Sequence, residues 1–120
     1  MNGFVDPGGR ALLGIELRPT RDAPVLSITA WIDTGFTGDL VLPQSVIDEL
    51  ALTLTGTAGA VLADGSQVAM KTYRCFIEWF RELRRLEVVA SEGECPLLGV
   101  GLLIEHELRI DYRSKVITLD

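Results

Sequence analysis

The chain has 120 residues, of which 48% are hydrophobic and 23% are charged, a balance typical of a folded globular domain. A formal charge of −6 and the lack of a long basic run argue against a nucleic-acid-binding protein. No apolar run approaches the ~20 residues of a membrane span, and the N-terminus lacks the pattern of a signal peptide. We therefore expect a single domain, residues 1–120, in the cytoplasm, bound to neither nucleic acid nor membrane.

The first half of the chain reads as short apolar runs separated by turn residues, which indicates an all-β fold. We expect strands at residues 3–5, 11–17, 25–32 and 40–42. The Asp-Pro-Gly-Gly run at residues 6–9 predicts a tight turn after the first of them. Pro43 precedes a short predicted helix at residues 46–50, for which Ser45 and Asp48 have the spacing of a capping box.

The middle of the chain predicts two hairpins, the second less clearly than the first. Residues 53–70 are rich in Thr, Gly, Val and Ala, and Asp64-Gly65 is a strong hairpin signal. Residues 73–90 combine two patterns. Phe76, Phe80 and Leu83 have helical spacing, whereas the alternation of apolar residues on either side of residues 80–82 favours two strands that turn there.

The end of the chain predicts one more strand, a short helix and a final hairpin. Residues 95–99 form an apolar strand ending in glycine, residues 100–105 a short helix, and residues 108–112 and 116–119 a hairpin turning at 113–115. A strand, an apolar-Gly step and a short helix thus occur twice, once around Asp33 and once around Leu98-Gly99. This similarity suggests an internal repeat.

The residue types used in metal and nucleophilic chemistry are scarce. The chain has two cysteines, Cys75 and Cys95, and a single histidine, His106, which is too few ligands for a zinc site. Two buried thiols are the favoured interpretation of the cysteines, with a disulfide as the alternative. His106 is expected at the surface. No Ser-His or Cys-His pair is evident, and we predict no metal site and no cofactor.

Asp33 stands between the apolar Ile32 and a glycine-containing turn, where an ionised carboxylate would be costly to bury without partners. An aspartate before glycine commonly caps a turn, so a surface role is one interpretation. The other is that a specific group meets the carboxylate.

The order Asp33-Thr34-Gly35 after an apolar strand, a glycine-bearing hairpin in mid-chain, and Leu97-Leu98-Gly99 before a short helix resembles the retropepsin-like aspartic proteases. The similarity is greatest to their small bacterial, single-lobe members and spans nearly the whole chain. It implies an all-β, closed β-barrel with one or two short helices. It also implies a homodimer in which each chain supplies one Asp33.

The resemblance assigns roles to three groups of residues. Asp33 would be half of a proton-sharing dyad, Gly35 would let the backbone approach the carboxylates, and Thr34 would hydrogen-bond across the dimer near the partner's Ile32. The hairpin turn Asp64, Gly65 and Ser66 would be a flap over an extended peptide or protein substrate. Residues Leu97, Leu98 and Gly99 would support the Asp33 loop from beneath.

Two positions depart from the viral members of this family. Phe36 follows the glycine where they carry a small residue, so a polar contact to the dyad is missing or supplied by Thr37. Val100 stands where they use an arginine to brace the dimer. The resemblance implies an aspartic endopeptidase. The alternatives are a non-catalytic dimeric module that binds a peptide or protein, and a small β domain in which Asp-Thr-Gly is incidental.

Overall fold

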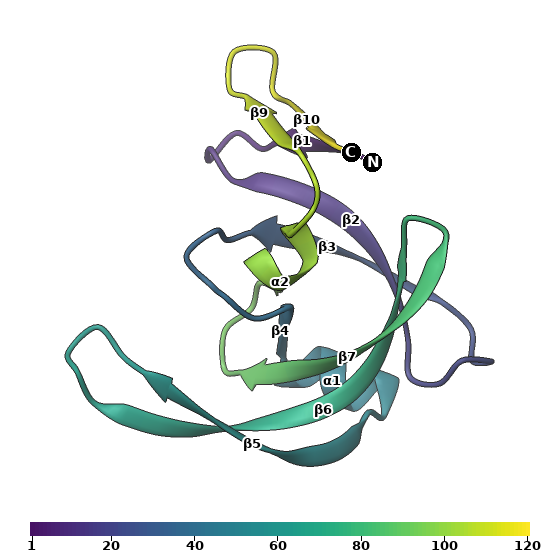
Figure 1. The fold of residues 1–120 in the computed structure, drawn as a ribbon, viewed down its shortest axis with the longest axis vertical. Helices are drawn as coiled ribbons and strands as arrows, with labels where there is room; N and C mark the ends of the chain where they lie inside the picture. The colour runs from purple at the N-terminus through teal and green to yellow at the C-terminus, as the bar shows by residue number, and fades with distance from the viewer.

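The computed structural model describes residues 1–120 and consists of ten strands in one sheet and two short helices (Figure 1). The elements are β1 (Asn2–Val5), β2 (Ala11–Arg18), β3 (Leu26–Ile32), β4 (Leu40–Pro43), α1 (Gln44–Leu50), β5 (Thr53–Val61), β6 (Gln67–Trp79), β7 (Glu82–Ser91), β8 (Leu97–Leu98), α2 (Val100–Leu103), β9 (Leu108–Asp111) and β10 (Val116–Leu119). The predicted mainly-β fold with two short helices is confirmed. Neither helix has the length and apolar character needed to cross a membrane.

The strands lie in the order β5-β6-β7-β4-β8-β3-β2-β1-β10-β9, with an additional pairing of β6 with β2. Because of that pairing, the six strands from β2 through β3, β8, β4 and β7 to β6 form a circuit that returns to β2. The sheet as a whole is not one closed barrel, since β5 extends it at one end and β1, β10 and β9 extend it at the other.

Alternating side chains explain which face of the sheet encloses the core. In β2, Leu13, Ile15 and Leu17 are fully buried, whereas the intervening Gly14 and Glu16 are exposed. These three side chains belong to a core cluster of 21 buried residues drawn from most of the strands and both helices. Leu12 is also buried but lies outside this cluster, because it is on the opposite face of β2.

The repeated strand-glycine-helix pattern corresponds to a reciprocal pairing in the structure. Strand β4 pairs in parallel with β7, and β8 pairs in parallel with β3, so the second strand of each unit lies beside the first strand of the other. Strand β8 also pairs antiparallel with β4. This exchange brings the Leu98-Gly99 segment between the two strands that flank the Asp33 turn.

Two local predictions differ from the structure. The capping box was wrong: helix α1 begins after Pro43 with no side-chain cap, and Gln44 instead donates a hydrogen bond to Asp48. The separate strands expected before residue 70 and after residue 73 form one long strand, β6. Its first part pairs with β5 and its second with β7, so both halves have hydrogen-bond partners.

The turn between β6 and β7 confirms the two-strand interpretation of residues 73–90. It consists of Phe80 and Arg81, both with positive φ, at 48° and 66°. Two such residues match the right-handed twist of a tight hairpin. The Phe80 ring stacks on the imidazole of His106, with centroids 4.2 Å apart. His106 is therefore half-buried rather than fully at the surface.

The two chain ends meet at one corner of the sheet, as Figure 1 shows. The Met1 ammonium donates to the Leu119 carbonyl at 2.7 Å, and the Leu119 N–H donates to the Met1 carbonyl at 2.8 Å. Strand β1 consequently pairs with β2 on one side and with β10 on the other. Both edges of β1 are satisfied within a single chain.

Candidate functional site

Asp33 follows the last residue of β3 and begins the loop that leads to β4. Its side chain is half-buried, whereas Thr34 and Gly35 are exposed. The backbone N–H of Asp33 donates to the Leu98 carbonyl at 2.8 Å, continuing the β3–β8 pairing by one residue. The sheet therefore fixes the backbone of Asp33 while the residues after it turn away.

The carboxylate of Asp33 is oriented by its own loop. The Gly35 N–H donates to Oδ1 at 2.9 Å, and the Phe36 N–H donates to the Asp33 carbonyl at 3.2 Å. A Cβ on residue 35 would lie 3.2 Å from the same Oδ1, so glycine gives this close approach the most room. One carboxylate oxygen thus has an internal donor, and the other is left for an external partner.

The segment after β8 holds the rest of the loop through three main-chain hydrogen bonds. The donors are the N–H groups of Gly99, Val100 and Gly101. Their acceptors are the carbonyls of Asp39, Phe36 and Gly38, at 2.9, 2.8 and 2.9 Å. Three consecutive backbone donors therefore hold the loop against the segment after β8 through main-chain hydrogen bonds.

Glycine is required at position 99 because the loop lies directly against it. A Cβ there would overlap the Gly38 carbonyl oxygen and would lie 2.8 Å from the Phe36 carbonyl oxygen. The Phe36 ring packs over Gly38 and Gly99, so this departure from the viral pattern fills space beneath the loop. Thr37 is exposed.

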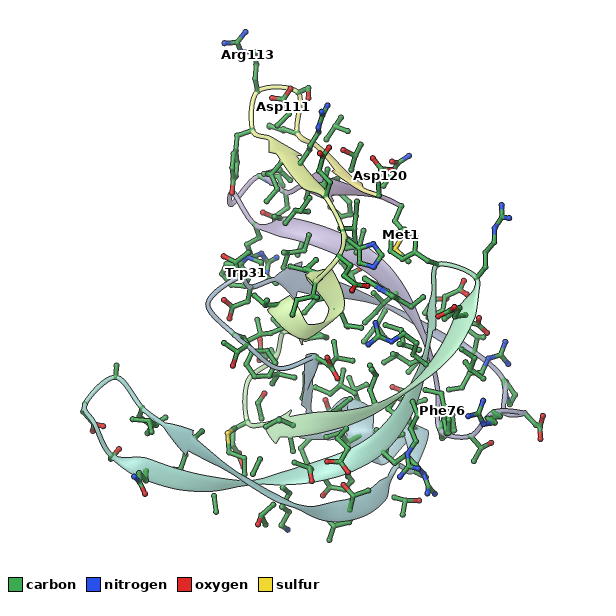
Figure 2. The ribbon with its side chains drawn as sticks, viewed as in Figure 1. Met1, Trp31, Phe76, Asp111, Arg113 and Asp120 are labelled. Carbon is green, nitrogen blue, oxygen red and sulfur yellow. The ribbon has the colours of Figure 1, made fainter.

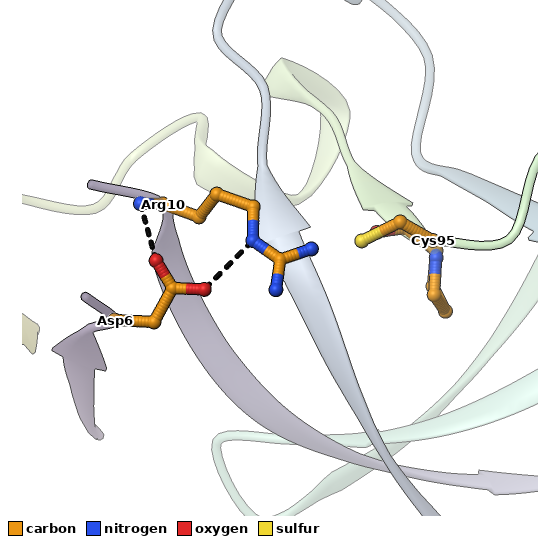
Figure 3. Close-up of polar contacts among 4 residues, drawn as sticks. Asp6, Arg10 and Cys95 are labelled. Atoms are coloured by element: carbon orange, nitrogen blue, oxygen red, sulfur yellow. Dashed lines mark hydrogen bonds and ion pairs between the residues drawn. The ribbon is translucent and has the colours of Figure 1, made fainter. Parts of the chain in front are cut away.

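Asp33 borders a cavity of about 430 Å³ that is lined by Trp31, Ile32, Asp33, Thr34 and Leu97. Nearby, Arg10 lies 5.8 Å from the Trp31 ring centroid and donates to Asp6 through its backbone and its Nε (Figure 3). The backbone N–H and then the guanidinium of Arg10 hold the pKa of Asp6 below its ordinary value. The charged Asp6 is thus paired with Arg10.

The predicted flap is a real hairpin, but it contributes no residue to this cavity. Strands β5 and β6 pair out to Val61 and Gln67, and the turn beyond them places Gly65 at φ +85°. Asp64 Oδ1 accepts the Ser66 hydroxyl at 2.6 Å and the Ser66 N–H at 2.9 Å, which lowers the pKa of Asp64. In Figure 1 the hairpin projects away from the rest of the sheet.

The remaining candidates lie elsewhere. Both cysteines are free, so the disulfide alternative is wrong. Cys75 is fully buried, and that burial raises the pKa of its thiol to about 11. Cys95 is half-buried and faces the Arg10 guanidinium in Figure 3. No group of three or more His, Cys, Asp or Glu side chains is placed to hold a metal ion.

The structure therefore brings together two of the three groups of residues singled out from the sequence: Asp33 to Gly35 and Leu97 to Gly99. Sequence reasoning missed Gly38, Asp39 and Gly101, which complete the contact between the loop and the segment after β8. The sequence signal for this contact was two pairs of closely spaced glycines, at 35 and 38 in the loop and at 99 and 101 after β8. Glycines at such spacing indicate two backbones in close approach.

No protein-family model and no curated protein matches this chain. Solved structures do. A retropepsin-like aspartic protease from Rickettsia conorii superposes with a TM-score of 0.69 at 17% identity, over 99% of this chain and 88% of that one. The EIAV protease, solved with the inhibitor HBY-793, superposes with a TM-score of 0.56 at 16% identity, over 82% of this chain and 88% of its own. The chain therefore has a retropepsin-like fold.

Proposed function

We propose that this protein is an aspartic endopeptidase, active as a homodimer in which two copies of Asp33 form the catalytic pair. The observation that carries the proposal is the Asp33 loop. The backbone of this aspartate is fixed by Leu98, one carboxylate oxygen is held by Gly35, and the side chain borders a cavity, all within a retropepsin-like fold.

The chemistry needs two carboxylates because one proton must be shared between them. Like charges a few ångströms apart cannot both ionise cheaply, so the pair holds one proton and titrates as a unit. The ionised member removes a proton from a water molecule as that water attacks the peptide carbonyl. The protonated member stabilises the developing oxyanion, and its proton then passes to the leaving amine.

An extended peptide is the substrate class that suits the sheet. Strand β5 is an edge strand, so its outer main-chain groups are free to pair with an added strand. The long β5–β6 hairpin would close over such a peptide as a flap, with Asp64, Gly65 and Ser66 at its tip. Two free thiols suit a reducing compartment, and we place the enzyme in the cytoplasm.

The same edge strand supports a second candidate, a dimeric module that binds a peptide or protein without cleaving it. Main-chain pairing along β5 requires no carboxylate chemistry. The two functions therefore differ in the role of Asp33. The endopeptidase needs this residue for turnover, whereas the binding module does not.

The test is the variant Asp33→Asn, assayed with the wild type on a library of denatured proteins across a range of pH. We expect the wild type to cleave with a bell-shaped pH profile, because activity requires one proton on the pair. The variant should lose roughly 10²- to 10⁴-fold in rate, the range of general acid-base catalysis. Asp22→Asn, a substitution in an exposed loop with the same charge change, should cleave normally.

Cleavage that persists in Asp33→Asn would contradict the endopeptidase. If the wild type never cleaves but both proteins bind the same peptides, the binding module is the correct function.

A further inference from the structure

A second cavity, of about 530 Å³, lies between the tip of the β6–β7 hairpin and the segment that follows α2. The hairpin lines it with Trp79, Phe80 and Arg84, and the segment lines it with Ile104 and His106. Its size is that of pockets that hold small molecules. No residue of the cavity beside the candidate aspartate takes part in it, so the two cavities are separate.

The indole of Trp79 carries a buried donor that has no acceptor. The residue is 2% exposed, and its Nε1 is the only buried side-chain nitrogen or oxygen in the chain without a hydrogen-bond partner. The indole ring lies perpendicular to the rings of Phe80 and His106, with centroids 5.4 and 6.1 Å away. The great majority of buried polar groups in folded proteins are paired, and an unpaired one lowers stability. An acceptor bound in the cavity would satisfy this N–H.

Arg84 is a second donor without a partner, and it points to the inner face of the sheet. Side chains alternate along β7, and Leu86 and Val88 belong to the core, so Arg84 shares their face. It is paired across the hairpin with the fully buried Ile77. The Arg84 side chain is half-buried and makes no ion pair and no hydrogen bond. An anion in the cavity would offset the cost of burying this charge.

These two donors favour a carboxylate as the ligand. The planar fork of a guanidinium matches the two oxygens of a carboxylate, and the indole N–H can donate to one of them. The stacked rings of Phe80 and His106, with the 63% exposed Ile104, offer an apolar wall for the rest of the molecule. Glu82 and Glu105 are exposed and also border the cavity, where they repel anions of higher charge. A singly charged carboxylate fits this balance.

The chain end holds one wall of the cavity in place. The Nδ1 of His106 donates to the Asp120 carbonyl at 3.2 Å. In Figure 2 Asp120 lies beside Met1 and apart from Trp31, which lines the cavity at the candidate aspartate. A ligand bound against His106 would therefore leave that other cavity free.

We propose that this second cavity binds a small carboxylate with an apolar side chain, held by the Arg84 guanidinium and the Trp79 indole N–H. A free apolar amino acid and the C-terminal residue of a peptide both present this chemistry. Only the free amino acid adds an ammonium group, which Glu82 and Glu105 would attract. The inference goes beyond the proposed endopeptidase and does not depend on it, since it uses no residue of the Asp33 loop.

The first test follows the indole N–H signals of the full chain by proton–nitrogen correlation NMR. The chain has two tryptophans, so the spectrum contains two indole signals, which the variant Trp31→Phe assigns. N-acetyl-phenylalanine should shift the Trp79 indole proton downfield, because its carboxylate accepts that N–H. The amide of the same compound lacks the carboxylate and should leave this signal in place. A Trp79 signal that does not move at millimolar acid, or that moves equally with the amide, would overturn the proposal.

The second test measures the affinity of variants by calorimetric titration. Arg84→Gln should weaken the binding of N-acetyl-phenylalanine about 10- to 100-fold, because a charge-assisted pair of hydrogen bonds is lost. Arg85→Gln is the matched control, since it makes the same charge change at an exposed residue on the opposite face of β7, and it should bind like the wild type. Neither arginine belongs to the core cluster, so both variants should melt like the wild type. Equal affinities of the two variants would disprove the site.

Titration of further compounds distinguishes the two sources of the carboxylate. Phenylalanine that binds more tightly than its N-acetyl derivative supports a free amino acid, because the ammonium group then adds to the affinity. The reverse order supports a peptide C-terminus, and a blocked dipeptide ending in phenylalanine should then bind at least as tightly. Inorganic phosphate that competes equally with the acid would contradict a carboxylate site. None of these outcomes depends on cleavage, so the endopeptidase and this site can fail separately.

Discussion

At the scale of single residues, the position of Asp33 explains why a carboxylate can follow a buried strand. Its backbone completes the pairing of β3 with β8, and its Oδ1 accepts the Gly35 N–H, so the carboxylate has a partner that the sequence itself supplies. The side chain is only half-buried, which keeps its desolvation cost small. Main-chain hydrogen bonds hold this arrangement, and they require glycine at positions where the two backbone segments approach closely.

The first residue-scale prediction concerns Gly99. The variant Gly99→Ala should lower the free energy of unfolding by about 1–3 kcal/mol, because the new methyl group must displace the loop carbonyls of Gly38 and Phe36. Chemical denaturation measures the loss. Gly14→Ala, in β2 with no atom within 4 Å of the added Cβ, is the control and should be close to neutral. Equal stability of the two variants would disprove the close contact.

The second concerns the two thiols. Burial raises the pKa of Cys75 to about 11 from an ordinary value of 9.0, so the folded state favours the neutral thiol. That contribution to stability is fully present below pH 9.0 and is lost as the pH rises through about 11. A thiol reagent at pH 8 should modify Cys95 rapidly in the native protein and Cys75 only after unfolding. Rapid modification of both would contradict the burial of Cys75.

At the scale of elements, the β5–β6 hairpin is the least supported part of the sheet. Beyond residue 54 nearly all of β5 and the first half of β6 is exposed, and the turn is held mainly by its own hydrogen bonds. Segments with few buried contacts open at low free-energy cost. This hairpin can therefore move as a unit while the core around β2 and β7 stays intact, as the proposed flap requires.

The prediction at this scale is that Asp64→Ala loosens the hairpin turn without lowering the melting temperature. Amide hydrogen exchange at Leu62, Gly65 and Ser66 should accelerate, because Asp64 accepts two hydrogen bonds from Ser66 and holds the turn closed. The pKa of Asp64 is lowered, so its contribution is present above pH 3.8 and is lost as the pH falls through the lower folded value. The protection of these wild-type amides, measured relative to the intrinsic exchange rate at each pH, should therefore fall in acid.

The matched control is Asp111→Ala. Asp111 holds the β9–β10 turn through the N–H groups of Arg113 and Ser114, with a pKa lowered in the same way. Its loss should accelerate exchange in that turn and leave the β5–β6 turn unchanged. Acceleration at both turns from either variant would show that the effect is global.

At the scale of the whole molecule, local sequence patterns predicted the strands and turns, but they did not predict which distant strands pair. Alternation and turn residues predicted most strands, and the Asp-Gly pair at residues 64–65 located the long hairpin, because these signals act between near neighbours. The continuity of β6 escaped prediction because its bent course depends on pairing with β5, β7 and β2 together. Likewise, no local signal indicates that β6 meets β2.

In the candidate site, too, some features were predicted from the sequence and others were not. That Asp33 and Leu98-Gly99 lie together was implied by the resemblance alone, and the hydrogen bonds are consistent with it. The filling role of Phe36 did not follow, because it depends on the space left between Gly38 and Gly99. The missing cap of α1 is a similar case, since Pro43 belongs to β4 and leads straight into the helix.

Strand β8 has only two residues, yet it is the direct link between β3 and β4 in the strand order. If its few hydrogen bonds opened, the order would separate into two groups of strands joined only through β6 and β2. The carbonyl that anchors Asp33 belongs to this same strand. Partial unfolding that begins at β8 would therefore abolish the geometry of the aspartate while most of the secondary structure persisted, so the candidate site would be lost before the fold.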